Sequence, residues 1–419
     1  MNRRFPTSVV VALLLISACS DDSKNSTDTE VAVTTVAPTT PDTAPDVVAS
    51  TTIPAPTETG ARAIVETLAA DNMRGRDNLT DGSLAAQDYL IGEISQFAQP
   101  VFAAEGNEGY LQHYAEGANI LALIPGGDLA DEYIMIGAHY DHLGTDCPTT
   151  DEADHICNGA ADNAGGVAAA VIAAKTIAAE GTPRRSVILA LWDGEEDGLV
   201  GSDNYLLDPV FPVEFTVAYI NLDIQGANLS PSLANTTVVV GAETGGSTLI
   251  DLTQDAIGKS TLESLQLSAI FGQGRSDYAN FVTAGVPIVF LTDANNGCYH
   301  TAQDDVTAFN FAKLEQQVGN TTELARALAA TDNPPTFDPA AALTNYNDAV
   351  SMLAVLERGK PDVGLLAADA QATYEQYLLD LQAIVDAGEA GFNDEAIGIL
   401  LSGAVAVVDA LTHAECLAA

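Results

Sequence analysis

Apolar residues in the middle of the chain follow two alternating patterns. Short apolar runs, which are typical of strands, lie at 119–124, 133–138, 186–191, 217–222, 238–240 and 286–291. Before and between them, apolar residues recur at helical spacing over 63–68, 84–97, 167–179, 202–207, 247–259 and 277–284. Because strands alternate with helices, we predict an α/β fold. It would be a three-layer sandwich, with a mostly parallel mixed sheet and helices on both faces.

The pattern changes after two consecutive prolines, Pro334 and Pro335. Beyond them, stretches rich in alanine and leucine predict helices over 345–356, 366–387 and 393–411. We therefore expect an α/β domain over 61–335 and a helical C-terminal extension over 336–419.

The start of the chain has the features of an export signal. A short basic segment precedes an apolar run over 9–16, which is too short for an ordinary membrane span. The segment ISAC that ends at Cys19 resembles a bacterial lipobox, in which the cysteine receives lipid. We predict a lipoprotein signal peptide over 1–18 and a disordered Thr/Pro-rich tether over 19–60. An ordinary secretory signal is the alternative, and both place the protein outside the cytoplasm.

The charge of the chain limits its partners. It has 15 Lys and Arg residues against 58 Asp and Glu residues, and its formal net charge is −43. Nucleic acid is excluded as a partner because binding phosphates requires a basic face. A polybasic contact with anionic lipid is also disfavoured, so the lipid anchor would be the protein's only attachment to a bacterial membrane. The sequence leaves the oligomeric state open.

Four cysteines remain once Cys19 is assigned to the anchor. They are Cys147, Cys157, Cys298 and Cys416, and an even number in an oxidising compartment suggests disulfides. Four cysteines allow three pairings. We favour the short loop from Cys147 to Cys157, which would leave the other two to tie the C-terminal tail to the body. Cysteine pairs also bind zinc, but no CxxC spacing is present.

Side chains of the kind that bind metals follow several predicted strands. In open α/β sheets, ligand sites lie beyond the carboxyl ends of the strands, so these side chains should meet at one edge. Imidazole nitrogens and carboxylate oxygens are zinc ligands, and their number suffices for two metals that share a carboxylate. The residues concerned are His139, Asp141, His142, Asp162, Asp193, Glu195, Glu196, Asp223 and His300, and Tyr299 directly precedes the last of them.

The same residues lie in segments that resemble the aminopeptidase Y / aminopeptidase S family of two-zinc exopeptidases. The segments occur in the family's order and cover about residues 62–335. They are GAHYDHLG (137–144), GAADNAGGVA (159–168), LWDGEEDGLVGS (191–202), INLDIQG (220–226), GRSDYANFVTAGVP (274–287) and CYHTAQDD (298–305), with a weaker similarity in LAADNMRGR (68–76). The resemblance implies a zinc-exopeptidase-like fold. The helical extension departs from the family's minimal domain.

The resemblance also implies a set of metal ligands. It assigns two Zn²⁺ ions to each chain. His139 and Asp223 would bind one ion, and Glu196 and His300 would bind the other. Asp162 would bridge the two. All of these residues are present in this chain.

Further roles are implied around these ligands. Glu195 would be the general base and later the general acid, and Asp141 would orient the ring of His139. Tyr299 would stabilise the tetrahedral oxyanion. His142 is not a ligand in the family's pattern, and we do not count it among the metal-binding residues.

These assignments predict a metal-dependent aminopeptidase that acts on peptides with a free N-terminus. A glutaminyl-cyclase-like acyltransferase on the same fold is one alternative, but such enzymes bind one zinc and lack the full set of five ligands. A carboxypeptidase is another, but it needs a basic pocket and Arg275 is the only basic residue near the motifs. A non-catalytic binding lipoprotein would not need Glu195.

Overall fold

The computed structural model describes residues 60–149, 154–412 and 416. The expected signal peptide, Cys19 and nearly all of the expected tether lie outside the described residues. Within them, no helix is both long enough and apolar enough to cross a membrane.

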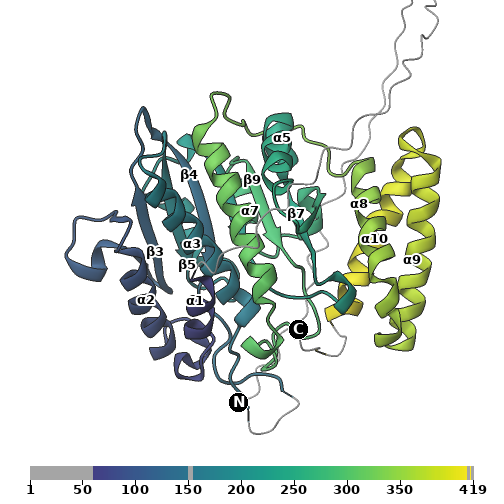
Figure 1. The fold of residues 1–419 in the computed structure, drawn as a ribbon, viewed down its shortest axis with the longest axis horizontal. Helices are drawn as coiled ribbons and strands as arrows, with labels where there is room; N and C mark the ends of the chain where they lie inside the picture. The colour runs from purple at the N-terminus through teal and green to yellow at the C-terminus, as the bar shows by residue number, and fades with distance from the viewer. Residues whose placement is uncertain (1–59, 150–153, 413–415, 417–419) are drawn as a thin grey trace, which may run out of the picture. The chain divides into compact units, whose positions relative to one another are not determined.

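A mixed sheet forms the centre of the fold (Figure 1). Its strands run in the order β1-β3-β5-β4-β6-β9-β7-β8, and β2 pairs with β3. The pairs β4/β5, β4/β6, β6/β9 and β7/β8 are parallel, and the other pairs are antiparallel. The strand bounds are β1 Gln99–Pro100, β2 Leu111–Tyr114, β3 Gly117–Ile124, β4 Leu129–His139, β5 Arg185–Trp192, β6 Thr216–Leu222, β7 Thr236–Val240, β8 Glu263–Leu267 and β9 Ile288–Thr292.

Both faces of the central strands are buried, as expected for a parallel sheet covered on both sides. Alternate residues of β4 show this clearly. Ile134 and Ile136 pack into the core beneath α1, α3 and α7, whereas Met135 packs on the other face among Trp192, Tyr219 and other aromatic residues. The helix bounds in this region are α1 Ala61–Leu68, α2 Asp81–Ile94, α3 Gly166–Glu180, α4 Val200–Leu207, α5 Gly246–Ile257, α6 Tyr278–Thr283 and α7 Phe311–Ala330. The predicted three-layer α/β fold is confirmed.

Three further helices form the predicted C-terminal extension: α8 Tyr346–Gly359, α9 Ala368–Ala387 and α10 Asp394–Thr412. They bury a small core of their own around Leu381 and Leu400 and lie side by side beyond β7 (Figure 1). Asp348 in the first turn of α8 attaches the helices to the sheet. Its carboxylate accepts hydrogen bonds from the backbone amide and the hydroxyl of Ser268, at 2.8 and 2.7 Å.

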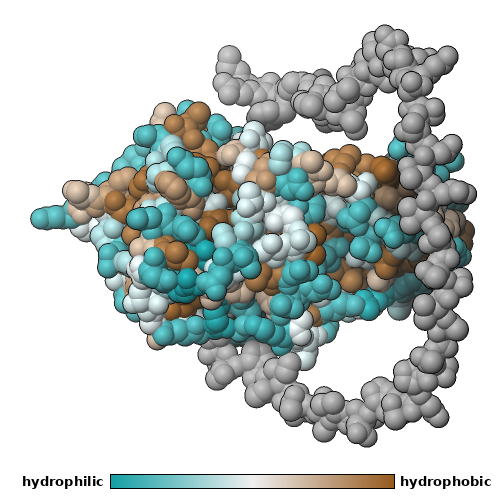
Figure 2. Space-filling view, turned by 90° about the horizontal axis from the view of Figure 1, so that it is seen from above, coloured by the Kyte–Doolittle hydropathy of each residue, from teal (hydrophilic) through white to brown (hydrophobic). Residues whose placement is uncertain are grey.

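Both favoured disulfides are present, Cys147–Cys157 and Cys298–Cys416. The second joins the chain beyond α10 to the loop that follows β9. The space-filling view shows hydrophilic side chains spread over the face that it presents, with apolar patches between them (Figure 2). Such a surface suits a chain with 58 acidic residues.

The sequence analysis missed some elements. No helix was predicted where α7 lies, because polar side chains interrupt the apolar pattern of this helix. Lys313, Gln317 and Asn320 are all buried there, each with a hydrogen-bond partner. It also missed β1, β2 and β8, which are short strands at the margins of the sheet with few apolar residues.

Candidate metal centre

The parallel strands deliver the candidate residues to one edge of the sheet, as predicted. His139 is the last residue of β4, and Asp223 directly follows β6. Glu195 and Glu196 lie in the loop after β5. Asp162 lies in the turn that precedes α3, and its peptide bond to Asn163 is cis.

Asp162 lies between two groups of ligand-type side chains. Its Oδ1 atom is 3.2 Å from Nε2 of His139, and the same nitrogen is 3.4 Å from Oδ1 of Asp223. Its Oδ2 atom is 3.2 Å from Nε2 of His300, which is 3.1 Å from Oε2 of Glu196. Each carboxylate oxygen of Asp162 therefore faces a different group. All five residues come together as the sequence analysis expected.

The donor set fits zinc, which takes imidazole nitrogen and carboxylate oxygen. Nε2 of His300 lies close to two carboxylate oxygens, yet it is buried and has no hydrogen-bond partner of good geometry. A buried ring nitrogen that faces two carboxylates in this way is suited to share a cation with them. His139, Asp162 and Asp223 also have ligand atoms that lie within 4.8 Å of one another.

The pKa values of the adjacent residues Glu195 and Glu196 are shifted in opposite directions. Burial raises the pKa of Glu195 well above its ordinary value, and Asp223 adds to the shift although His139 opposes it. Burial also disfavours the charged form of Glu196, but His142 and His300 outweigh it and lower the pKa of Glu196. Glu195 is thus suited to exchange a proton, whereas Glu196 stays ionised. A raised pKa suits a general base, and an ionised carboxylate suits a metal ligand.

Asp141 links the first histidine to the glutamate loop. Its Oδ1 atom is 3.5 Å from Nδ1 of His139, and its backbone oxygen is closer to the same nitrogen, at 3.2 Å. Its carboxylate also accepts hydrogen bonds from the backbone amides of Glu195 and Glu196, both at 3.2 Å. Asp141 therefore fixes the loop that carries the two glutamates as well as contacting the ring of His139.

Tyr299 lines the same cleft as Asp162, Glu195 and Asp223. Its ring stacks on that of His300, with the centroids 3.7 Å apart. Burial raises the pKa of its hydroxyl, and the neighbouring carboxylates raise it further. Tyr299 therefore keeps its proton and can act as a hydrogen-bond donor in the cleft.

The sequence analysis set His142 aside, yet the structure brings it to the centre. Its Nδ1 atom is 2.7 Å from Oε1 of Glu196 and 3.9 Å from Oδ2 of Asp162. Its other ring nitrogen is buried without a hydrogen-bond partner. The sequence does hold a clue to this residue, because His142 lies in the same segment after β4 as His139. His142 is a further candidate for the second group.

Two buried residues hold the loops of the centre in place, and the sequence analysis gave neither a role. The carboxylate of Asp304 accepts the backbone amides of Ala161 and Asp162, at 2.9 and 3.0 Å. The guanidinium of Arg76 donates to four backbone carbonyls. One of them directly follows His139, and two lie close before Asp162. The four carbonyls belong to Leu68, Tyr140, Asn158 and Gly159. Arg76 lies in the segment LAADNMRGR.

Asp277 is a third residue that the sequence analysis did not single out. It is fully buried, and neither of its carboxylate oxygens has a hydrogen-bond partner of good geometry, although Ser202 lies close enough to oppose the rise in its pKa. Burial raises the pKa of Asp277 to about 7, and the charge of His139 is the largest influence that opposes this shift. The residue lies one position before α6 in the segment GRSDYANF.

Residues 119–325 match peptidase family M28, and this range holds every candidate ligand. This part of the chain belongs to peptidase family M28. It is therefore a domain of a zinc-dependent peptidase family, which is a broader group than the aminopeptidase Y / aminopeptidase S subfamily named from the sequence.

Two relatives illustrate the match. Leupeptin-inactivating enzyme 1 of Streptomyces exfoliatus is 26% identical over 309 residues, which cover 65% of this chain and 61% of the relative. A probable zinc metalloprotease of Pyrenophora tritici-repentis is 25% identical over 366 residues, which cover 72% of this chain and 74% of the relative. The chain thus spans less than two thirds of the first relative.

Solved structures show the same fold. The aminopeptidase LapA of Legionella pneumophila has a TM-score of 0.52 at 19% identity, over 65% of this chain and 72% of LapA. A glutaminyl cyclase of Bacteroides thetaiotaomicron has a TM-score of 0.50 at 18% identity, over 64% of this chain and 97% of the cyclase. At such identities the likeness extends to the fold alone, and it includes proteins of two reaction classes.

Proposed function

We propose that this protein is a two-zinc aminopeptidase, which removes residues one at a time from the free N-termini of peptides. One observation carries the proposal. Asp162 offers a separate oxygen to each of two ligand groups, and the protonatable Glu195 lies in the loop beside them. His139 and Asp223 would hold one zinc with Asp162, and Glu196 and His300 would hold the other.

The chain's own residues supply the proton transfers. When bound, zinc acts as a Lewis acid and lowers the pKa of water, which allows attack on a peptide carbonyl at neutral pH. Glu195 takes the proton from the attacking water and later returns it to the leaving amine, a role favoured by its raised pKa. Tyr299 donates its hydroxyl proton in a hydrogen bond to the oxygen on which negative charge develops.

The charge of the cleft supports a substrate with a free amine. Asp162, Glu195 and Asp223 line it, whereas Arg275 is the only lysine or arginine among its described lining residues. A cationic α-amino group suits such surroundings better than an α-carboxylate does. This argues against the carboxypeptidase alternative, although a probable glutamate carboxypeptidase of Arabidopsis thaliana is 29% identical over 200 residues.

We also propose that the protein is an exported lipoprotein, held on the outside of a bacterial membrane through Cys19. The two disulfides support this location, because such bonds persist in oxidising compartments. Replacement of Cys19 by serine should shift the protein from the detergent-soluble membrane fraction to the aqueous fraction.

The test of the activity uses the purified protein loaded with zinc and a panel of aminoacyl-p-nitroanilides. We expect hydrolysis that is lost with a chelator, and two zinc ions per chain by elemental analysis. In Glu195→Gln, kcat should fall by about 10²–10⁴-fold while both ions remain bound. Asp197→Asn, an exposed acidic residue of the same loop, is the matched control. One zinc per chain without hydrolysis of any unblocked substrate would refute the proposal and favour the cyclase.

A further inference from the structure

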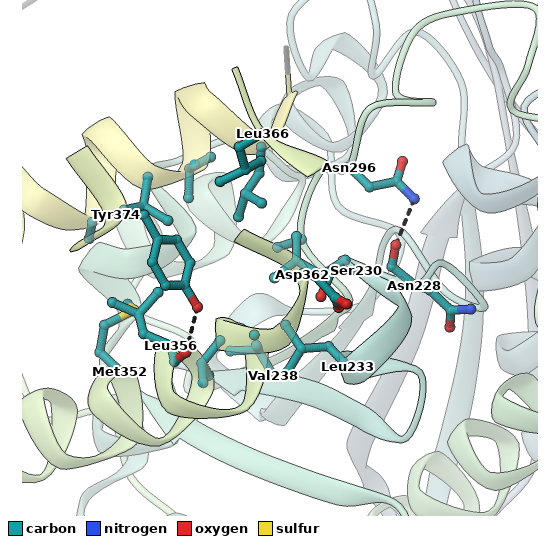
Figure 3. Close-up of a pocket in the computed structure, with 18 of the residues that line it drawn as sticks. Asn228, Ser230, Leu233, Val238, Asn296, Met352, Leu356, Asp362, Leu366 and Tyr374 are labelled. Atoms are coloured by element: carbon teal, nitrogen blue, oxygen red, sulfur yellow. Dashed lines mark hydrogen bonds between the residues drawn. The ribbon is translucent and has the colours of Figure 1, made fainter. Parts of the chain in front are cut away.

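A second cavity lies between the sheet and the C-terminal helices (Figure 3). Its volume is about 140 Å³. One wall comes from the sheet, through Val238 and Val240 of β7 and Leu267 of β8. The opposite wall comes from α8, α9 and α10 and includes Met352, Leu356, Tyr374, Ala404 and Val407.

The two cavities share part of their walls. Phe271, Gln273, Thr292, Ala294 and Val408 line both the apolar cavity and the cleft that contains Glu195. The apolar cavity is therefore a side chamber of the catalytic cleft. A substrate held at the metal centre has this space directly beside it.

The chamber suits a single apolar group. An engineered cavity of about 150 Å³ lined by apolar side chains binds benzene, so a chamber of this size accepts one ring or one branched aliphatic side chain. Two of the polar side chains that line it already have hydrogen-bond partners. The hydroxyl of Tyr374 donates to the backbone oxygen of Leu356, and Nδ2 of Asn296 donates to the backbone oxygen of Asn228 (Figure 3).

Helix α10 presents one face to the chamber. Ala404, Val407, Val408 and Leu411 follow helical spacing and all line it. Beyond the helix, Cys416 is bonded to Cys298, whose next neighbours are Tyr299 and His300. The wall of the chamber is thus covalently fixed to the loop that carries two residues of the metal centre.

We propose that this chamber receives the side chain of the substrate's N-terminal residue, and that the C-terminal helices therefore select peptides that begin with a large apolar residue. The inference rests on the proposed aminopeptidase function and deepens it. The preferred residues are aromatic or branched aliphatic, because the chamber is apolar and has the volume of one ring. A peptide that begins with alanine or glycine leaves the chamber unfilled.

The test compares p-nitroanilides of phenylalanine, leucine and alanine. A single methylene in an apolar pocket discriminates by about 10–200-fold, so kcat/KM for the phenylalanine derivative should exceed that for alanine by at least about 100-fold. Ala404→Phe places a ring in the chamber and should reduce this ratio at least tenfold. Val405→Phe is the matched control, because Val405 lies next to it on α10 but is 53% exposed, and it should leave the ratio unchanged.

A second variant and a binding measurement complete the test. Val238→Phe fills the chamber from the sheet side and replaces Ala404→Phe if that variant does not fold by circular dichroism. Calorimetric binding of L-phenylalaninamide and L-alaninamide to zinc-loaded Glu195→Gln gives a readout without turnover, and the filled variants should lose affinity for the phenylalanine compound selectively.

Different outcomes separate the two proposals. Hydrolysis of alanine and phenylalanine derivatives at equal kcat/KM overturns the chamber's role but leaves the aminopeptidase standing. The chamber's role is also overturned if Ala404→Phe and Val405→Phe have the same ratio of kcat/KM for phenylalanine over alanine. Hydrolysis of no unblocked derivative by the zinc-loaded protein overturns the proposed function, and the assignment of the chamber falls with it.

Discussion

Replacement of Arg76 by lysine tests whether a buried cation organises the metal centre. Burial lowers the pKa of Arg76 to about 10, although the carboxylates of Asp304 and Asp162 oppose the shift, so the group is charged at neutral pH. Its guanidinium donates to four backbone carbonyls at distances from 2.6 to 3.0 Å. A lysine keeps the charge, but its single nitrogen cannot reproduce the planar fork.

The size of the effect follows from these contacts. A hydrogen bond to a charged group contributes about 1.5–3 kcal/mol, so the loss of two of the four costs about 3–6 kcal/mol of unfolding free energy. The loops that carry His139 and Asp162 also lose their common anchor. Loss of such supporting contacts typically weakens metal binding about 10–100-fold, and we expect a loss of zinc affinity in this range.

Urea unfolding of the metal-free protein would measure the first effect, because the single tryptophan, Trp192, is buried and reports on the core. Competition with a chromophoric chelator would measure zinc affinity. Arg62→Lys is the control, because Arg62 is 43% exposed and pairs with Glu66 on the surface of α1. Equal stability and equal zinc affinity in the two variants would refute the reasoning.

Two further predictions concern stability. In the chain-entropy account, loss of Cys298–Cys416, which spans 118 residues, lowers the free energy of unfolding by up to about 5 kcal/mol. Loss of Cys147–Cys157, which spans 10 residues, lowers it by up to about 3 kcal/mol. Urea unfolding of the two double serine variants measures both losses, and the opposite order would contradict the account. Burial raises the pKa of Asp277 to about 7 from an ordinary value of 3.8, so the stability that its protonated form contributes is complete below pH 3.8 and is lost as the pH rises through 7. Asp277→Asn should therefore be more stable than the parent at pH 8 in the presence of a chelator, with little advantage at pH 5; a constant difference across this range would contradict the assignment.

The central strands and most of the site could be predicted from the sequence because both depend on local patterns. Strands β4, β5 and β6 are buried on both faces and appear as continuous apolar runs. The polar residues that follow them are necessarily brought to one edge of the sheet. Helices α8, α9 and α10 were predicted within a few residues, since each is long and rich in alanine and leucine.

What the sequence analysis missed depends on contacts between distant segments. Arg76 and Asp304 act on backbone groups far away in the chain, and no local pattern indicates such contacts. His142 was set aside because the family's pattern omits it, and only the fold brings its ring to Glu196. The apolar chamber arises where the helical extension meets β7, so neither part alone predicts it.

The bond between Cys298 and Cys416 has a consequence for the lifetime of the protein among proteases. It closes a ring of chain that includes Tyr299, His300 and all three C-terminal helices. A single cut anywhere within that ring produces no separate fragment, because both new ends remain joined through the disulfide. A nicked molecule would therefore keep the full set of candidate ligands in one covalent unit, and the cut would become visible only after reduction.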